Sequence, residues 1–110
     1  MNRAKTPPAP TDLSPGSKRI WRDVHQGWDL DESARQLLGI ALRGFDRAAQ
    51  ARALVARDGL IVTGTRGPRP HPAVSIERTS TELALKAWRQ LNLDVPAPGP
   101  MGRPPGRGPA

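Results

Sequence analysis

Side chains that commonly carry enzyme chemistry are sparse in this 110-residue chain. The sequence contains no Cys and no Tyr, which removes two common nucleophiles and one common proton donor. His25 and His71 are too far apart in sequence to form a zinc site by themselves, and His71 has no acidic neighbour to orient it. Neither a Walker-type phosphate loop nor a Gly-x-Ser-x-Gly elbow occurs. We therefore expect no catalytic site, no metal and no cofactor.

Basic side chains are the more informative group. Seventeen Lys and Arg residues stand against 10 Asp and Glu residues, for a formal charge of +7. Such an excess favours a polyanionic partner, with nucleic acid first and an anionic membrane second. A compositional bias toward Arg is the alternative explanation. The excess falls in residues 1–28, 60–71 and 96–110, whereas residues 29–59 and 72–95 are balanced.

Five of these basic residues are candidates for DNA contact. Lys18, Arg19 and Arg22 lie on one side of a predicted helix, where a solvated helix face is an equally good interpretation. Arg66 and Arg69 lie in a Gly- and Pro-rich loop, from which they can reach phosphates. The arginines of the predicted second helix are interleaved with acids, so we expect them to be solvated or to contact another subunit.

Hydrophobic spacing and end signals predict a mainly α fold. The three helices are predicted at about residues 15–27, 32–57 and 72–92. Ser14 can cap the first helix and Asp31 the second, while Gly59 follows the end of the second. The acidic cluster around Asp31 is accordingly interpreted as a helix start. Gly39 and Gly44 are predicted to allow a close approach between helices.

Three other segments complete the predicted organisation. Residues 60–63 are β-prone and residues 64–67 favour a turn, which together predict a short β-hairpin or an ordered loop. Residues 1–12 are rich in Pro and predict a flexible arm, and residues 96–110 predict a disordered Pro/Gly tail. The helical domain is therefore residues 13–95.

Aromatic and large apolar residues of the helices are candidates for the core or for subunit contacts. They are Trp21, Trp28, Leu38, Phe45, Leu83 and Trp88. Base stacking by the tryptophans is the alternative interpretation. On the third helix, the spacing places Ile76, Ser80, Leu83, Ala87 and Leu91 on one face. Because a core of this size is marginal and no disulfide is available, we expect a homo-oligomer.

The membrane is not among the expected partners. No apolar run approaches the roughly 20 residues that a bilayer-spanning helix needs. Residues 1–12 also lack the apolar stretch of a signal peptide. The sequence therefore predicts a soluble, intracellular protein.

The order of several short motifs resembles a known family. These motifs are Leu13-Ser14-Pro15, Lys18-Arg19-Ile20-Trp21-Arg22, Trp28-Asp29-Leu30-Asp31, Asp58-Gly59-Leu60-Ile61-Val62-Thr63, His71-Pro72-Ala73-Val74 and Leu91-Asn92-Leu93. Their order and spacing, over about residues 7–96, resemble the terminase small subunits of tailed phages and prophages. Two departures stand out. The family usually has Asn-Pro where this chain has His71-Pro72. Its last helix often ends in a Gly-Leu-Thr-Pro-like sequence followed by an Arg, whereas Asn92-Leu93-Asp94-Val95-Pro96 has no nearby Arg.

The resemblance implies a function in viral genome packaging. Such subunits form rings, bind the packaging site of double-stranded DNA and deliver it to a large subunit that supplies the ATPase and the nuclease. They have no catalytic site, and they act in the cytoplasm of the bacterial host. The alternative is a small helical protein-interaction or scaffold module whose basic charge is compositional.

Overall fold

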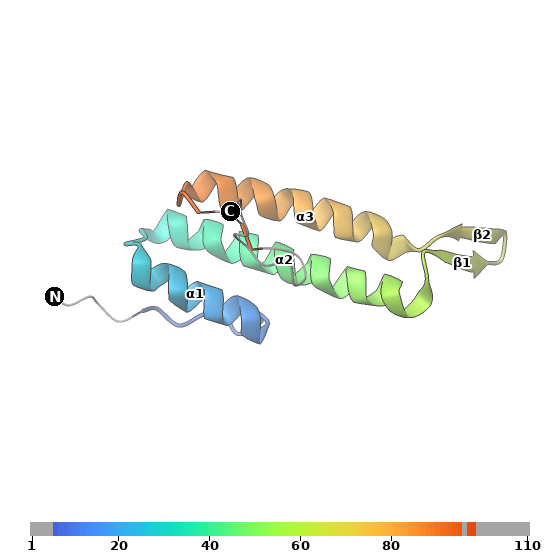
Figure 1. Ribbon diagram of the computed structural model, residues 1–110, viewed down its shortest axis with the longest axis horizontal. Coiled ribbons are helices and arrows are strands. Elements are labelled where there is room, and N and C mark those ends of the chain that lie inside the picture. Colours follow the sequence, from blue (N-terminus) through green and yellow to red (C-terminus); the bar gives the residue numbers. More distant parts are fainter. Residues whose placement is uncertain (1–5, 96, 99–110) are drawn as a thin grey trace, which may run out of the picture.

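The structure is a computed structural model, in which residues 6–95, 97 and 98 are described. Its elements follow in the order α1 (Pro15–Gly27), α2 (Glu32–Asp58), β1 (Ile61–Gly64), β2 (Gly67–Pro70) and α3 (Pro72–Leu91). α2 and α3 form a long antiparallel pair, and α1 lies beside α2 (Figure 1). The predicted mainly α fold, with a β-hairpin between the second and third helices, is confirmed.

The ends of the first two helices are fixed by local side chains. The Ser14 hydroxyl accepts a hydrogen bond from the Ser17 N–H at 3.1 Å, and Asp31 Oδ1 accepts one from the Ala34 N–H at 2.9 Å. Gly59 follows α2 with φ of 92°, a conformation that Gly adopts without strain. The caps predicted at these positions are therefore confirmed.

A carboxylate on α2 holds the start of α1. Asp46 accepts hydrogen bonds from the Ser14 N–H at 2.8 Å and from the hydroxyls of Ser14 and Ser17 at 2.7 Å each. A negative group beside the first turn also interacts favourably with the positive end of the α1 dipole. These three bonds set where α1 lies along α2.

The core lies where the three helices meet. Leu38 and Leu42 of α2 are fully buried, and Trp21 of α1 and Trp88 of α3 are 5% and 6% exposed. Phe45 packs edge-on against Trp88, with ring centroids 6.3 Å apart. The predictions that placed Trp21, Leu38, Phe45 and Trp88 in packing positions agree with this arrangement.

The segments that flank the helices also pack on this core. Trp21 Nε1–H donates to the Pro7 carbonyl at 2.9 Å, so part of the predicted arm lies along α1. After α3, Leu93 is buried, and Trp88 Nε1–H donates to the Val95 carbonyl at 3.2 Å. The rest of the predicted arm and tail, residues 1–5, 96 and 99–110, lies outside the described residues.

A seam of small residues joins α2 and α3. A Cβ added at Gly44 would lie 2.8 Å from Ala84 Cβ and 3.1 Å from the Ser80 carbonyl oxygen. The close approach predicted at Gly44 is therefore confirmed. At Gly39 the same prediction is wrong, because an added Cβ there would meet only the Arg43 guanidinium, at 3.4 Å.

The narrow seam changes which side chains are buried. On α3, Ser80 and Ala84 face α2, whereas Ile76 and Leu83 are 46% and 57% exposed. The face predicted to carry Ile76, Ser80, Leu83, Ala87 and Leu91 is therefore split. Branched side chains do not fit between helices this close, so they lie on the flank of the pair. Leu83 does not belong to the core of the chain.

Trp28 is also too exposed to be a core residue. It follows α1 as its C-cap, where the chain turns toward α2, and it is 37% exposed. Its position at this corner prevents full burial by α1 and α2. For Trp28 and Leu83, contact with another subunit stays a prediction.

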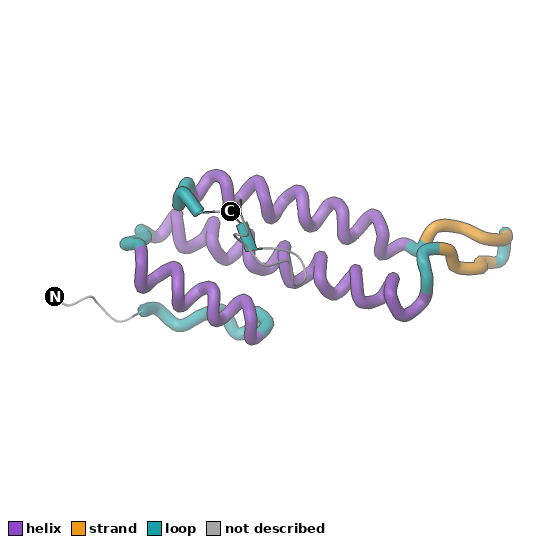
Figure 2. The backbone as a smooth tube through the Cα atoms, in the orientation of Figure 1, coloured by secondary structure: helices purple, strands orange, loops and turns teal. Residues whose placement is uncertain are grey.

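The remaining helix, α1, packs on only one half of the α2–α3 pair. Figure 2 shows α1 beside the half of the α2–α3 pair that is remote from the hairpin. Among the described elements, no third layer covers the other half, from which β1 and β2 extend. A two-stranded hairpin on a two-helix stem leaves much of its apolar surface exposed.

Candidate nucleic-acid interface

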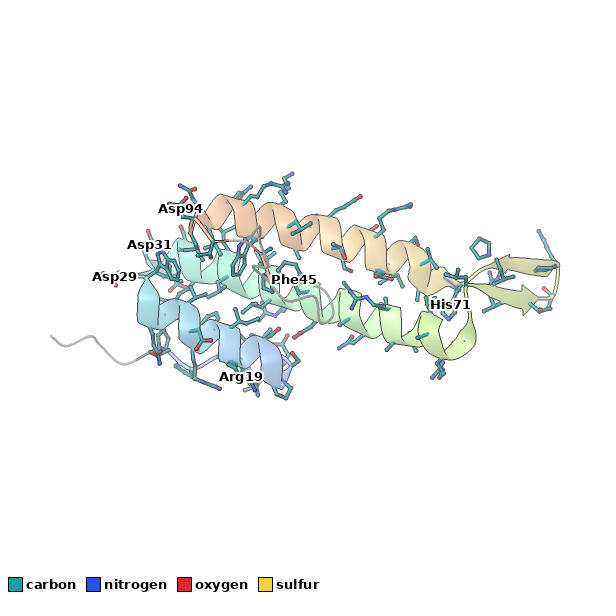
Figure 3. The ribbon with its side chains drawn as sticks, viewed as in Figure 1. Arg19, Asp29, Asp31, Phe45, His71 and Asp94 are labelled. Carbon is teal, nitrogen blue, oxygen red and sulfur yellow. The ribbon has the colours of Figure 1, made fainter. Side chains whose placement is uncertain are left out.

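Lys18, Arg19 and Arg22 lie on the side of α1 that faces away from the core. Arg19 and Arg22 are exposed and Lys18 is half-buried, while Trp21 and Val24 on the opposite side are buried. Figure 3 shows Arg19 pointing away from α2. α1 therefore presents this basic trio outward on a helix that Asp46 holds in place.

Arg66 and Arg69 belong to the hairpin. Arg66 lies in the two-residue turn between β1 and β2, and Gly67 after it has φ of 106°. Arg69 is on β2, and its side chain crosses to β1, where a Cβ added at Gly64 would meet Arg69 Nε at 3.3 Å. No acidic residue occurs from position 59 to position 70. The hairpin therefore carries two exposed cations and no carboxylate.

The base of the hairpin is braced by His71. The Nδ1 atom of His71 accepts from the Ala73 N–H at 3.0 Å, so this side chain caps α3. Because Nδ1 accepts, the ring proton lies on Nε2, which donates to Asp58 Oδ2 at 2.9 Å. The His71 N–H also donates to the Leu60 carbonyl at 2.7 Å. Figure 3 shows His71 where α3 meets the hairpin.

This contact corrects the expectation that no acidic group orients His71. Asp58 ends α2, and the hairpin returns the chain so that His71 lies beside it. Hydrogen bonds from Arg57 and then His71 hold the pKa of Asp58 well below its usual range. The Asp58 carboxylate therefore links the end of α2 to the start of α3. The neighbour was missed because it lies 13 residues earlier in the sequence.

Ion pairing divides the basic residues into two groups. Four arginines are ion-paired: Arg35 with Glu32, Arg43 with Asp12, Arg52 with Glu77 and Arg57 with Asp58. The other nine Lys and Arg side chains of the described residues form no ion pair within that part of the chain. They are Lys18, Arg19, Arg22, Arg47, Arg66, Arg69, Arg78, Lys86 and Arg89. All five predicted DNA-contact residues belong to this second group.

Sequence reasoning missed the cations of α3. Residues 72–95 have equal numbers of acidic and basic residues, so they were predicted to be neutral. However, Glu77 pairs across the seam with Arg52 at 3.1 Å. Arg78, Lys86 and Arg89 are exposed. They share one broad side of the helix with Glu82, and a count by segment does not show that Glu77 is already paired.

The structure does not bring the two predicted basic groups together. The trio of α1 lies beside the covered half of the helix pair, and the hairpin extends from the far end (Figure 1). Acidic residues lie opposite the hairpin, since Figure 3 shows Asp29, Asp31 and Asp94 at the other end. The molecule therefore has an acidic end and a basic hairpin end.

An apolar groove runs along one flank of α2 and α3. Ile40, Ile76 and Leu83 line it with exposed fractions of 51%, 46% and 57%, and Gly44 lies between the helices. The groove has a volume of about 470 Å³. Arg43 and Arg47 also line it, and none of its described lining residues is acidic. We name this surface the flank groove.

Three further observations bear on function. Within the described residues, no cluster of three His, Asp or Glu side chains has the placement to hold a metal ion. No described helix combines the length and apolar character that crossing a membrane requires. Comparisons with protein-family models, with curated proteins and with solved structures gave no match.

Proposed function

We propose that this protein is a non-catalytic, oligomeric DNA-binding protein that acts as a phage terminase small subunit. The observation that carries the DNA-binding part is the group of nine cationic side chains that form no ion pair among the described residues. Cations that contact phosphates release condensed counterions from DNA, and this release drives binding. An arginine already paired with a carboxylate contributes less, because it must first exchange that partner.

The specific role rests on the order of the sequence motifs. In that role the protein binds the packaging site of double-stranded phage DNA in the cytoplasm of the bacterial host. It then brings the DNA to the large terminase subunit, which supplies the ATPase and the nuclease. The hairpin would turn toward DNA, and the opposite end, which carries Asp29 and Asp94, would turn away from it.

The flank groove supports the oligomeric part of the proposal. Ile76 and Leu83 are large apolar side chains that the chain itself leaves half-exposed. A patch of this kind on a thin two-helix stem is better covered by a second copy of the chain than by water. A contact between unlike surfaces of successive copies closes into a ring when its rotation permits. We therefore propose a homo-oligomeric ring.

The dependence of DNA affinity on salt tests the proposal. We expect the logarithm of the binding constant to fall linearly with the logarithm of salt concentration. The triple variant Lys18→Ala/Arg19→Ala/Arg22→Ala should reduce this slope by about 0.9 for each phosphate contact that it removes. Fluorescence anisotropy with a labelled duplex measures both quantities.

A control with the same loss of charge is Arg35→Ala/Arg43→Ala/Arg57→Ala, in which every replaced arginine is ion-paired. Its slope should stay closer to that of the wild type. Equal slopes for the two triple variants would mean that only total charge matters. Assembly without DNA binding at physiological salt would favour the scaffold module with compositional charge.

A further inference from the structure

The two faces of the hairpin differ in chemistry. Because cross-strand partners lie on the same face, the register places Ile61 with Pro70 and Thr63 with Pro68 on one side. All four side chains are exposed, and Ile61 is 60% exposed. This apolar face has no cover within the described part of the chain. It extends from the stem as a surface suited to a partner.

The outer edge of β2 cannot donate hydrogen bonds at its two proline positions. The His71 N–H bonds to the Leu60 carbonyl at 2.7 Å, which continues the ladder by one pair beyond β1 and β2. In an antiparallel ladder, hydrogen-bonded and non-hydrogen-bonded pairs alternate. Pro68 and Pro70 therefore occupy positions where an N–H would point outward, and proline has none. The edge opposes the addition of another strand.

The second face is thin and basic. It carries the pair Val62 and Arg69 and, next to the turn, the pair Gly64 and Gly67, where no side chain adds to the width of the ribbon. The Arg69 side chain lies across Gly64, and Arg66 is exposed in the turn. The brace between His71 and Asp58 fixes the hairpin at its base. The tip is therefore a narrow ribbon with two cations and an apolar, proline-bordered side.

These features match the DNA minor groove. Narrow minor grooves, typical of A·T tracts, have an enhanced negative potential that attracts inserted Arg side chains. Proteins that bind this groove also use apolar residues, Pro and Ile among them, against the base steps. Arg side chains also read guanine in the major groove, so the narrow ribbon and its proline-bordered apolar face are what favour the minor groove.

We propose that the hairpin is a minor-groove arm, in which Arg66 and Arg69 enter the groove and Pro68, Pro70 and Ile61 contact its apolar surfaces. The arm gives the protein a preference for DNA with a narrow, A·T-like minor groove. This inference rests on the proposed DNA binding and adds the groove and the mode of recognition. Sequence is then read through groove shape and the pattern of A·T against G·C pairs.

Replacing guanosine by inosine separates the two grooves. Inosine lacks the minor-groove amino group of guanosine but keeps its major-groove acceptors, so an I·C duplex is A·T-like in one groove and G·C-like in the other. The full chain would be titrated against A·T, G·C and I·C duplexes of equal length. We expect both A·T and I·C duplexes to bind about tenfold more tightly than the G·C duplex.

The variant Arg66→Ala/Arg69→Ala should lose this preference. The matched control Arg78→Ala/Arg89→Ala removes two exposed cations of α3 and should lower overall affinity while keeping the ratio between duplexes. Circular dichroism would establish that both variants are folded. If the I·C duplex binds like the G·C duplex, recognition lies in the major groove and the inference is wrong.

Other outcomes distinguish the inference from the proposed function. Equal binding of all three duplexes would overturn the minor-groove arm and leave DNA binding intact. Binding of none would overturn the proposed function. If the hairpin variant changes the mass of the assembly and keeps the duplex preference, the hairpin is a protein contact and the inference is wrong.

Discussion

At the scale of single residues, two carboxylates connect elements that are distant in sequence. Asp46 accepts three hydrogen bonds from Ser14 and Ser17, and Asp58 accepts from Arg57 and His71. Hydrogen bonds to charged groups are roughly twice as strong as neutral ones. Neither contact was foreseen, because an isolated Asp gives no sign of which distant donor it meets. The local caps at Ser14 and Asp31 were predictable, since donor and acceptor lie three residues apart.

Asp58 predicts how stability depends on pH. Its pKa is lowered in the folded state from an ordinary value of 3.8. Its contribution is therefore fully present above that value and is lost as pH falls toward the lower folded pKa. Asp12 and Glu32 have lowered pKa values as well, so they add to the loss in acid.

We expect Asp58→Ala to be less stable than the wild type at pH 7 and to lose less stability between pH 5 and pH 2. Urea unfolding of both proteins across this range measures the difference. An equal loss in both would mean that the carboxylate does not make the contacts described.

At the scale of elements, helix limits were predictable and buried faces were not. Ser14, Asp31 and Gly59 mark ends through contacts with nearby backbone. The buried side of α3 depends instead on how closely α2 approaches, which Gly44 sets through contact with Ala84. Apolar spacing alone therefore selected side chains that lie on the flank. Of the candidate site, four of the five predicted cations are exposed and Lys18 is half-buried, whereas the unpaired cations of α3 emerged only once Glu77 was found paired with Arg52.

The seam makes a prediction for its two glycines. Gly44→Ala should destabilise the fold by about 1–3 kcal/mol, because the added Cβ overlaps Ala84 and forces the helices apart. Gly39→Ala is the matched control in the same helix. Its Cβ meets only the end of the flexible Arg43 side chain. The gain in helix propensity should therefore stabilise the fold by up to about 1 kcal/mol.

Thermal unfolding followed by circular dichroism checks these opposite signs. If Gly44→Ala stabilised the fold as Gly39→Ala does, Gly44 would not be at a close helix contact.

At the scale of the whole molecule, the distribution of charge and the packing of α1 on the α2–α3 pair are both asymmetric. The hairpin end carries Arg66 and Arg69, and the opposite end carries Asp29 and Asp94. α1 covers one half of the α2–α3 pair, and the flank groove exposes apolar side chains along the pair. An assembly that buries the flank groove would remove the exposed apolar surface, and one that turns the hairpins toward DNA would place the basic ends at the phosphates. Assembly and DNA binding are therefore expected to depend on each other.

Multi-angle light scattering of the protein with duplex DNA tests this joint claim most directly. At micromolar concentration we expect a mass of several 11.9 kDa subunits, and a further increase when a duplex is added. Leu83→Glu should reduce the assembly to monomers that remain helical, because a charge in an apolar contact loses its hydration. The control Glu82→Gln changes an exposed neighbour and should keep the assembly. A wild-type protein that stays monomeric and leaves the mass of the duplex unchanged would contradict the account.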